Sequence, residues 1–293
     1  MRFGMVYLPT DRSAPLHQLA VAAEERGFGA LLVGDHTHIP ARRTTPFIAG
    51  DVLPEEYYRL VDPFVALASA APVTTHLQLG TCICLVAQRD PIVTAKQVAS
   101  VDHISGGRFV FGVGYGWNVE EARDHRIEWS SRRARVKEYV AAMRALWTED
   151  RATYHGEFVD FDEAFSWPKP ARRPAPPVLL GASPTDRVFG EVLDWADGWL
   201  PVPFLGHQPA DVTRLRQLAE DGGRDPASLS IVVDGLPPDP AWIDPWMNTG
   251  VDAILVPAES EPLDALLPAL DAAAAVIERY MPAATPVPGR TDG

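Results

Sequence analysis

Two neighbouring polar residues, Asp35 and His36, directly follow the apolar run at residues 30–34. An imidazole gains and loses a proton near neutral pH, and a reaction that moves a hydride to or from a carbon bonded to oxygen needs a proton partner. His36 therefore has the chemistry for acid–base catalysis. The alternative, from the residue alone, is a histidine that only makes hydrogen bonds within its loop.

Glycines mark a second place where a ligand could approach the chain. Residues 106–118 have the sequence GGRFVFGVGYGWN, with glycines at 112, 114 and 116 near the end of a predicted strand. Backbone without Cβ atoms lets a ligand come close, so such a strand end is typical of a binding site. The same spacing also suits any tight turn from strand to helix. Tyr115 and Trp117 could stack on a ring or pack against the next helix.

The histidines and cysteines predict neither a metal site nor a structural disulfide. His36 and His38 are two residues apart, but no convincing set of further ligands accompanies them. Cys82 and Cys84 are the only cysteines, and on one strand they share a face, which is poor geometry for a disulfide. We interpret both thiols as packing residues in a reducing compartment.

Composition limits the partners of this chain. Its formal net charge is −13, with acidic and basic residues interspersed, which argues against a broad surface for nucleic acid or anionic membrane. The start MRFGMVYLP lacks a signal-peptide pattern, and the apolar stretch 263–277 is interrupted by Asp264 and Asp271. We expect a cytoplasmic protein that binds any anionic ligand in a local basic pocket.

Apolar runs typical of strands alternate with helical patterns along the whole chain. The predicted strands are residues 2–8, 30–34, 77–86, 108–114, 178–181, 198–202, 229–234 and 252–257. Eight such units without a linker predict a single α/β domain over residues 1–293, a (β/α)8 TIM barrel; an open doubly wound sheet is the alternative. Residues 149–177, rich in proline and aromatics, are expected to form an insertion near the barrel mouth that could cover a pocket.

Several segments in this order resemble a known family. They are LVGDHTHIP from 32, LGTCICLVAQRDPIVTAKQVASVDHISGGRFVFGVGYGWN from 79, WSSRRARVKEYVAAMRALW from 129, YHGEFVDFD from 154, WPKPARRPAPPVLLGAS from 167 and ADGWLP from 196. Together they resemble the bacterial luciferase-like monooxygenase superfamily, and within it the coenzyme F420-dependent oxidoreductase branch. The resemblance is continuous over residues 1–205 and looser beyond.

The resemblance implies a TIM barrel that holds a flavin or deazaflavin ring over its mouth. It implies His36 as the acid–base residue, with Asp35 beside it at the cofactor. It also implies a non-proline cis peptide between Cys82 and Ile83 that backs the ring. Tyr115 and Asn118 match positions near the cofactor; relatives that act on sugar phosphates have glutamate where this chain has Tyr115, which argues against that activity.

The resemblance further implies that the turn Gly181, Ala182 and Ser183 receives the cofactor phosphate. Backbone N–H groups at the start of the following helix would face the anion. Two features count against this site. Close relatives have a second glycine where this chain has Ala182, and Ser183 with Asp186 matches a capping motif that would use those N–H groups internally. Arg187 adds a compensating positive charge.

These implications combine into one expected function: an F420-dependent oxidoreductase that transfers a hydride between the deazaflavin and a small organic substrate, with His36 as acid–base residue. An FMN-dependent luciferase-like monooxygenase is the first alternative. A non-catalytic ligand-binding relative that has lost its phosphate turn is the second. Because luciferase-like barrels commonly dimerise, a homodimer is also expected.

Overall fold

Eight parallel strands close into a barrel, as the alternating pattern predicts. The computed structural model describes residues 1–50 and 52–280. Around the barrel the strands lie in the order β1 (Arg2–Tyr7), β10 (Ala253–Ala258), β9 (Ser230–Val233), β8 (Gly198–Trp199), β7 (Val178–Gly181), β4 (Phe109–Gly114), β3 (Gln78–Cys84) and β2 (Ala30–Val33). Because β1 pairs with both β10 and β2, the ring is closed and the open doubly wound sheet is excluded.

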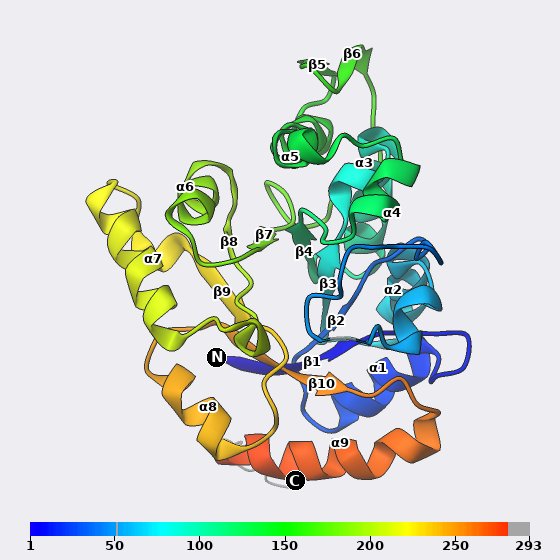
Figure 1. The fold of residues 1–293 in the computed structure, drawn as a ribbon, viewed down its shortest axis with the longest axis vertical. Helices are drawn as coiled ribbons and strands as arrows, with labels where there is room; N and C mark the ends of the chain where they lie inside the picture. The colour runs from blue at the N-terminus through cyan, green and yellow to red at the C-terminus, as the bar shows by residue number, and fades with distance from the viewer. Residues whose placement is uncertain (51, 281–293) are drawn as a thin grey trace, which may run out of the picture.

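Helices surround the strands on the outside of the ring (Figure 1). They are α1 (Leu16–Glu25), α2 (Pro63–Ala70), α3 (Pro91–Ile104), α4 (Val119–Asp124), α5 (Arg132–Thr148), α6 (Asp186–Trp195), α7 (Pro209–Asp221), α8 (Pro240–Met247) and α9 (Leu263–Ile277). Asp62 caps α2 with Pro63 at its first position, a pairing of residue types typical of a helix start. Among the helices of the described ranges, none is long and apolar enough to cross a bilayer.

The core has two layers. Inside the barrel, small aliphatic side chains fill the space between opposite strands: Ala30, Leu32, Val110, Leu179, Leu200, Val232, Ala253 and Leu255. A larger apolar layer lies between the strands and the helices. Cys82 and Ile83 pack on top of the inner layer, so these two residues form part of the surface on which a ligand at the barrel mouth would rest.

The glycines of β4 serve strand packing more than ligand approach, which corrects the first interpretation of residues 106–118. A Cβ at Gly112 would clash with the backbone oxygen of Thr81 on β3, and one at Gly114 would clash with Ile83. Gly181 on β7 likewise makes room for Ile83. Gly116 is different, because its φ of +76° lies in the left-handed region that favours glycine and turns the chain after the strand.

The segment 149–177 contains a two-stranded antiparallel hairpin, β5 (Ala152–His155) and β6 (Asp160–Ala164). The carboxylate of Glu138 on α5 accepts hydrogen bonds from the backbone N–H groups of Glu157, Phe158 and Val159 and fixes the hairpin turn. Figure 1 shows the hairpin beyond α5, on the side away from the barrel strands. Residues 149–177 contribute none of the side chains that line the cavity described below.

Candidate active site

A cavity of about 690 Å³ opens at the carboxyl ends of the barrel strands, which is the face where TIM barrels bind ligands. A cavity of this volume is large enough for an organic cofactor together with a small substrate. The predicted site residues that line it are Asp35, His36, Cys82, Ile83, Tyr115, Gly181, Ala182 and Ser183. The structure thus brings together residues at or just after the carboxyl ends of four different strands.

His36 is almost fully buried and is held from both sides. Its Nδ1 lies 2.8 Å from Oε2 of Glu121, and its Nε2 lies 3.2 Å from the indole nitrogen of Trp117. Because an indole N–H can only donate, Nε2 must accept, and the ring proton must sit on Nδ1, where it donates to Glu121. His36 is therefore neutral in this arrangement, with its lone pair on Nε2 beside the cavity-lining Trp117.

Asp35 has a positioning role in the loops around the cavity. Its two carboxylate oxygens accept hydrogen bonds from the guanidinium of Arg89, and one of them also accepts from the backbone N–H of Leu85. Arg89 extends the network to Asp62 at the start of α2. The ends of β2 and β3 are tied together in this way, and direct contact between Asp35 and a cofactor remains a prediction.

Asn118 does not line the cavity and is fully buried behind it. Its side-chain oxygen accepts a hydrogen bond from the backbone N–H of Glu121 and begins α4. Asn118 therefore places the carboxylate that holds His36. Among the described residues its amide nitrogen has no hydrogen-bond partner, so the structure leaves one donor of Asn118 unused.

Glu120, the neighbour of Glu121, fixes the loop that follows His36. Its carboxylate accepts hydrogen bonds from the backbone and hydroxyl groups of Thr44 and Thr45. These hydrogen bonds hold the pKa of Glu120 well below its ordinary value. The short helix α4 thus controls both the histidine and the loop on one side of the cavity.

Tyr115 belongs to a second polar network at the cavity. Its hydroxyl donates to Glu191, which also accepts hydrogen bonds from Arg133, and the Arg133 guanidinium lies 4.4 Å from the centre of the Tyr115 ring. Burial, together with the charge and hydrogen bond of Glu191, raises the pKa of Tyr115 far above its usual range. Tyr115 is therefore a neutral, fixed wall of the cavity.

The predicted phosphate turn is open toward the cavity. Thr185 caps α6 by accepting from the backbone N–H of Val188, so Ser183 is not the cap and the predicted capping motif is wrong. The carboxylate of Asp186 pairs with Arg214 instead of the helix start. Ala182 has no left-handed backbone, so the missing second glycine causes no strain there. The strain argument against a phosphate site is thereby removed, whereas Thr185 still uses the backbone N–H of Val188 internally and Asp186 lies in the first turn of α6.

Two arginines that the sequence argument did not assign, Arg132 and Arg133, line the cavity at the start of α5. Burial and the charges of Arg133 and Arg187 lower the pKa of Arg132, and within the described ranges its buried Nε has no partner. Arg133 is neutralised by Glu191. Among the described residues Arg132 pairs with no carboxylate; its guanidinium lies over the Trp129 ring and donates to the Trp129 carbonyl. A phosphate at the start of α6 would supply an anion.

Glu121, Arg132 and Arg133 were not identified from the sequence, which contains only weak indications of their roles. Glu121 lies on the short helix after β4, where its burial could not be inferred from the letters. Arg132 and Arg133 stand in the first turn of α5, where positive charge opposes the helix dipole. Placing basic residues at an unfavourable helix end is a signal of function, and it was available in the sequence.

The predicted cis peptide between Cys82 and Ile83 is present. Ile83 packs into the space left by Gly114 and Gly181, and the register of β3 against β4 shifts at this point. The bulged strand therefore presents Cys82 and Ile83 to the cavity rather than continuing the ladder.

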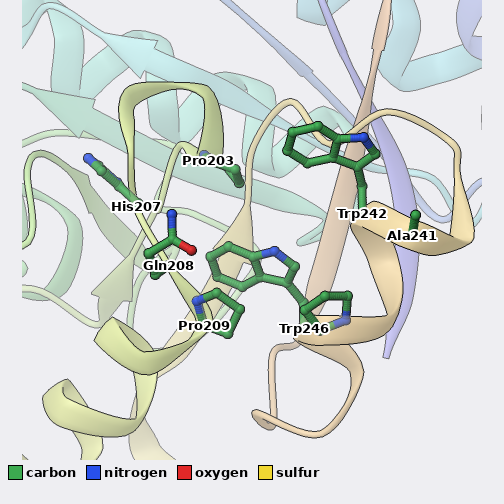
Figure 2. Close-up of a pocket in the computed structure, with 8 residues that line it drawn as sticks. Pro203, His207, Gln208, Pro209, Ala241, Trp242 and Trp246 are labelled. Carbon is green, nitrogen blue, oxygen red and sulfur yellow. The ribbon is translucent and has the colours of Figure 1, made fainter.

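A second, smaller pocket of about 330 Å³ lies between the start of α7 and α8. Figure 2 shows Trp242 and Trp246 from α8 opposite Pro203, His207 and Pro209. Its titratable group, His207, accepts a hydrogen bond from the backbone N–H of Val202 and stacks on Trp199. The rest of the lining is mainly proline and tryptophan, so His207 is the titratable side chain that this pocket offers.

The closed parallel barrel with a cavity at its strand ends defines the protein as an α/β barrel. The profile of the luciferase-like monooxygenase family matches residues 1–237. An uncharacterised protein of Mycobacterium tuberculosis is 38% identical over 258 residues, which cover 87% of this chain and 91% of that protein. The chain therefore belongs to the luciferase-like monooxygenase family.

Two solved structures share this fold. Monooxygenase RslO1 from Streptomyces bottropensis has a TM-score of 0.77 at 21% identity, and the match covers 96% of this chain and 98% of that one. An F420-dependent secondary alcohol dehydrogenase in complex with an F420–acetone adduct has a TM-score of 0.72 at 17% identity, covering 96% and 100%. At these identities the likeness shows the fold alone.

Proposed function

We propose that this chain is an F420-dependent oxidoreductase that transfers a hydride between the deazaflavin and a small organic substrate in the cytoplasm. The observation that carries the proposal is His36, held between Glu121 and Trp117 at the edge of the cavity. Hydride transfer at a carbon bonded to oxygen needs one proton partner, and a neutral imidazole whose Nε2 gives up its hydrogen bond from Trp117 can provide it. The F420-dependent alcohol dehydrogenase of the same fold supports this choice of cofactor.

The residues of the cavity fit a phosphate-bearing cofactor. Arg132 and the start of α6 would hold its phosphate, while Cys82, Ile83 and Tyr115 would contact its ring. When bound, the cofactor supplies the hydride chemistry. Nε2 of His36 exchanges its hydrogen bond to Trp117 for one to the substrate hydroxyl and takes that proton. For reduction of a carbonyl, the protonated ring returns it from the same atom.

The first test is binding. F420 and FMN are titrated into the purified protein and followed by fluorescence. We expect F420 to bind in the micromolar range or tighter and FMN to bind more weakly. Tight binding of FMN without binding of F420 would overturn the choice of cofactor, and failure of both to bind would support the non-catalytic alternative.

An FMN-dependent monooxygenase is the second candidate, and it is supported by the fold shared with monooxygenase RslO1. A monooxygenase consumes oxygen with reduced FMN, whereas a deazaflavin enzyme reduces or oxidises its substrate without oxygen. Turnover in sealed, oxygen-free vessels separates the two. Undiminished activity without oxygen supports hydride transfer, and activity that requires oxygen supports the monooxygenase.

A further inference from the structure

One ionisable group of the cavity has no place in the mechanism above. Asp234 follows β9, its carboxyl group lines the cavity, and its Oδ1 is buried with no hydrogen-bond partner in the part of the chain that the structure describes. Asp234 as a whole is half-buried, but buried polar atoms in proteins are nearly always bonded, and a buried carboxylate oxygen without a partner is unfavourable. The exception points to a partner that comes with a ligand.

The position of Asp234 places it at the floor of the cavity. Its neighbour is the thiol of Cys82, which hydrogen-bonds to the carboxyl group, so that each group shifts the pKa of the other and only Oδ1 is left without a partner among the described residues. Cys82 belongs to β3 and Asp234 follows β9, and three strands separate β3 from β9 in either direction around the barrel. The two side chains therefore meet across the barrel axis, beneath any molecule that enters the mouth.

The charged state of Asp234 suits an acceptor near neutral pH. Burial raises its pKa to about 6, so the carboxylate is charged at pH 7.5 and takes a proton below pH 6. The groups that face it are the Cys82 thiol, whose pKa lies well above its usual value, and Tyr57, whose pKa is about 12. His36 and His207 line the same cavity. Neither Cys82 nor Tyr57 brings a positive charge to the carboxylate.

We infer that Asp234 is a ligand-binding residue whose carboxylate accepts a hydrogen bond from an O–H or N–H group at the buried end of the molecule in the cavity. This inference rests on the proposed function, because it takes the cavity to be the cofactor and substrate site. The donor is either the imide N–H of a flavin-type ring or the hydroxyl group of a substrate. The site would therefore favour ligands that carry an O–H or N–H group at their buried end.

Two variants test the inference: Asp234→Asn keeps the shape without the charge, and Asp234→Leu removes hydrogen bonding altogether. Asp271→Asn is the matched control, because Asp271 is exposed and pairs with Arg26 on the outer helices. Dissociation constants of F420, FMN and riboflavin are measured by fluorescence at pH 7.5. If the donor belongs to the ring, both Asp234 variants bind all three molecules at least tenfold more weakly, and the control is unchanged.

Cyclohexanol tests the second possibility, in which the hydrogen-bond donor is the hydroxyl group of the substrate. It is titrated into the cofactor complexes of the wild type and the variants. If the Asp234 variants bind cyclohexanol at least tenfold more weakly but bind F420, FMN and riboflavin as the wild type does, the donor belongs to the substrate. No difference in either affinity overturns the inference.

The pH dependence uses riboflavin, because it lacks the phosphate that itself titrates near pH 6. Wild-type affinity should fall as the pH drops from 7.5 to 5, and Asp234→Asn should show a flatter profile. An identical slope in both proteins would count against Asp234 and would assign the titration to other groups of the cavity.

Melting of the cofactor-free protein separates this inference from the proposed function. Relief of an unpaired buried carboxylate should raise the melting midpoint of Asp234→Leu by about 2–5 °C. A lower midpoint for both Asp234 variants identifies a structural carboxylate and overturns the inference. If the wild type binds neither F420 nor FMN, the proposed function fails, while the melting result still decides the role of Asp234.

Discussion

The tautomer of His36 is the residue-scale feature on which catalysis depends. Trp117 can only donate to Nε2, so the proton is on Nδ1 and Glu121 must accept it. Glu121→Gln places an amide beside Nδ1 that can donate as well as accept, and the wrong tautomer then becomes accessible. We expect the turnover number to fall about 10²- to 10⁴-fold, the range typical of lost acid–base catalysis.

The measurement for Glu121→Gln is steady-state turnover together with the dissociation constant of F420. The dissociation constant should stay within about twofold of the wild type, since Glu121 lies behind His36. His36→Ala should lose as much turnover as Glu121→Gln, and the double variant should lose no more than either single one, because the pair acts as a unit. Additive losses would show that Glu121 acts independently of His36.

The position of Arg132 at the cavity makes a second residue-scale prediction. Arg132→Gln should lower the affinity for FMN at least tenfold. The affinity for riboflavin, which has no phosphate, should stay within about twofold of the wild-type value. The exposed Arg151 on the insertion, which pairs with Glu163, is the control position. Fluorescence titration of the two flavins checks the prediction. Equal losses of affinity for FMN and riboflavin would show that the phosphate does not bind at Arg132.

At this scale the sequence could identify residues but not their partners. His36 and Ser183 follow predicted strands and the barrel geometry brings strand ends together, while the place of Cys82 came from the family resemblance; all three line the cavity. The pairs His36–Glu121 and Arg133–Glu191 join residues far apart in the chain. Such pairs depend on side-chain directions in the folded barrel, which residue spacing alone does not contain.

At the scale of elements, α4 clamps the loop after β2 through Glu120. Its carboxylate collects hydrogen bonds from Thr44 and Thr45, so Glu120→Ala should destabilise the fold by about 1–3 kcal/mol. Because the folded-state pKa lies well below the ordinary 4.5, this stabilisation is full above pH 4.5 and is lost as the pH falls toward the folded-state value. Urea unfolding of both proteins at pH 7 and at pH 3.5 measures the difference.

The difference in stability between the wild type and Glu120→Ala should therefore be smaller at pH 3.5 than at pH 7. An exposed glutamate such as Glu163 serves as the control position, where alanine should change little at either pH. A stability difference that increases at the lower pH would contradict the proposed role of the Glu120 carboxylate.

Strand positions were predictable because barrel strands are buried on both faces and appear as continuous apolar runs. The start of α6 was not, because Ser183 and Thr185 both favour the cap position and lie two residues apart. The hairpin β5–β6 also escaped prediction. Its second strand is largely exposed, so it lacks the apolar pattern that marks the barrel strands.

At the scale of the whole molecule, we propose that the chain forms a homodimer through α2 and α3. Val65, Ile92, Val93 and Ile104 on these two helices are 48–64% exposed. Val93 faces solvent, while Val98 of the same helix is buried. Several exposed aliphatic side chains on two helices that pack against each other are typical of a protein interface.

Replacement of both Val65 and Val93 by aspartate should convert the dimer to a monomer, because burying two unpaired charges in an apolar contact is strongly unfavourable. Trp242→Asp on α8 is the matched control, since α8 lies on a different side of the barrel and Trp242 is 53% exposed (Figure 1). Light scattering coupled to size exclusion measures the mass of all three proteins. A monomeric wild type would refute the dimer outright. If only the Trp242→Asp variant becomes monomeric, the dimer interface lies at α8. The prolines and tryptophans that line the smaller pocket would then be covered by the second copy of the chain.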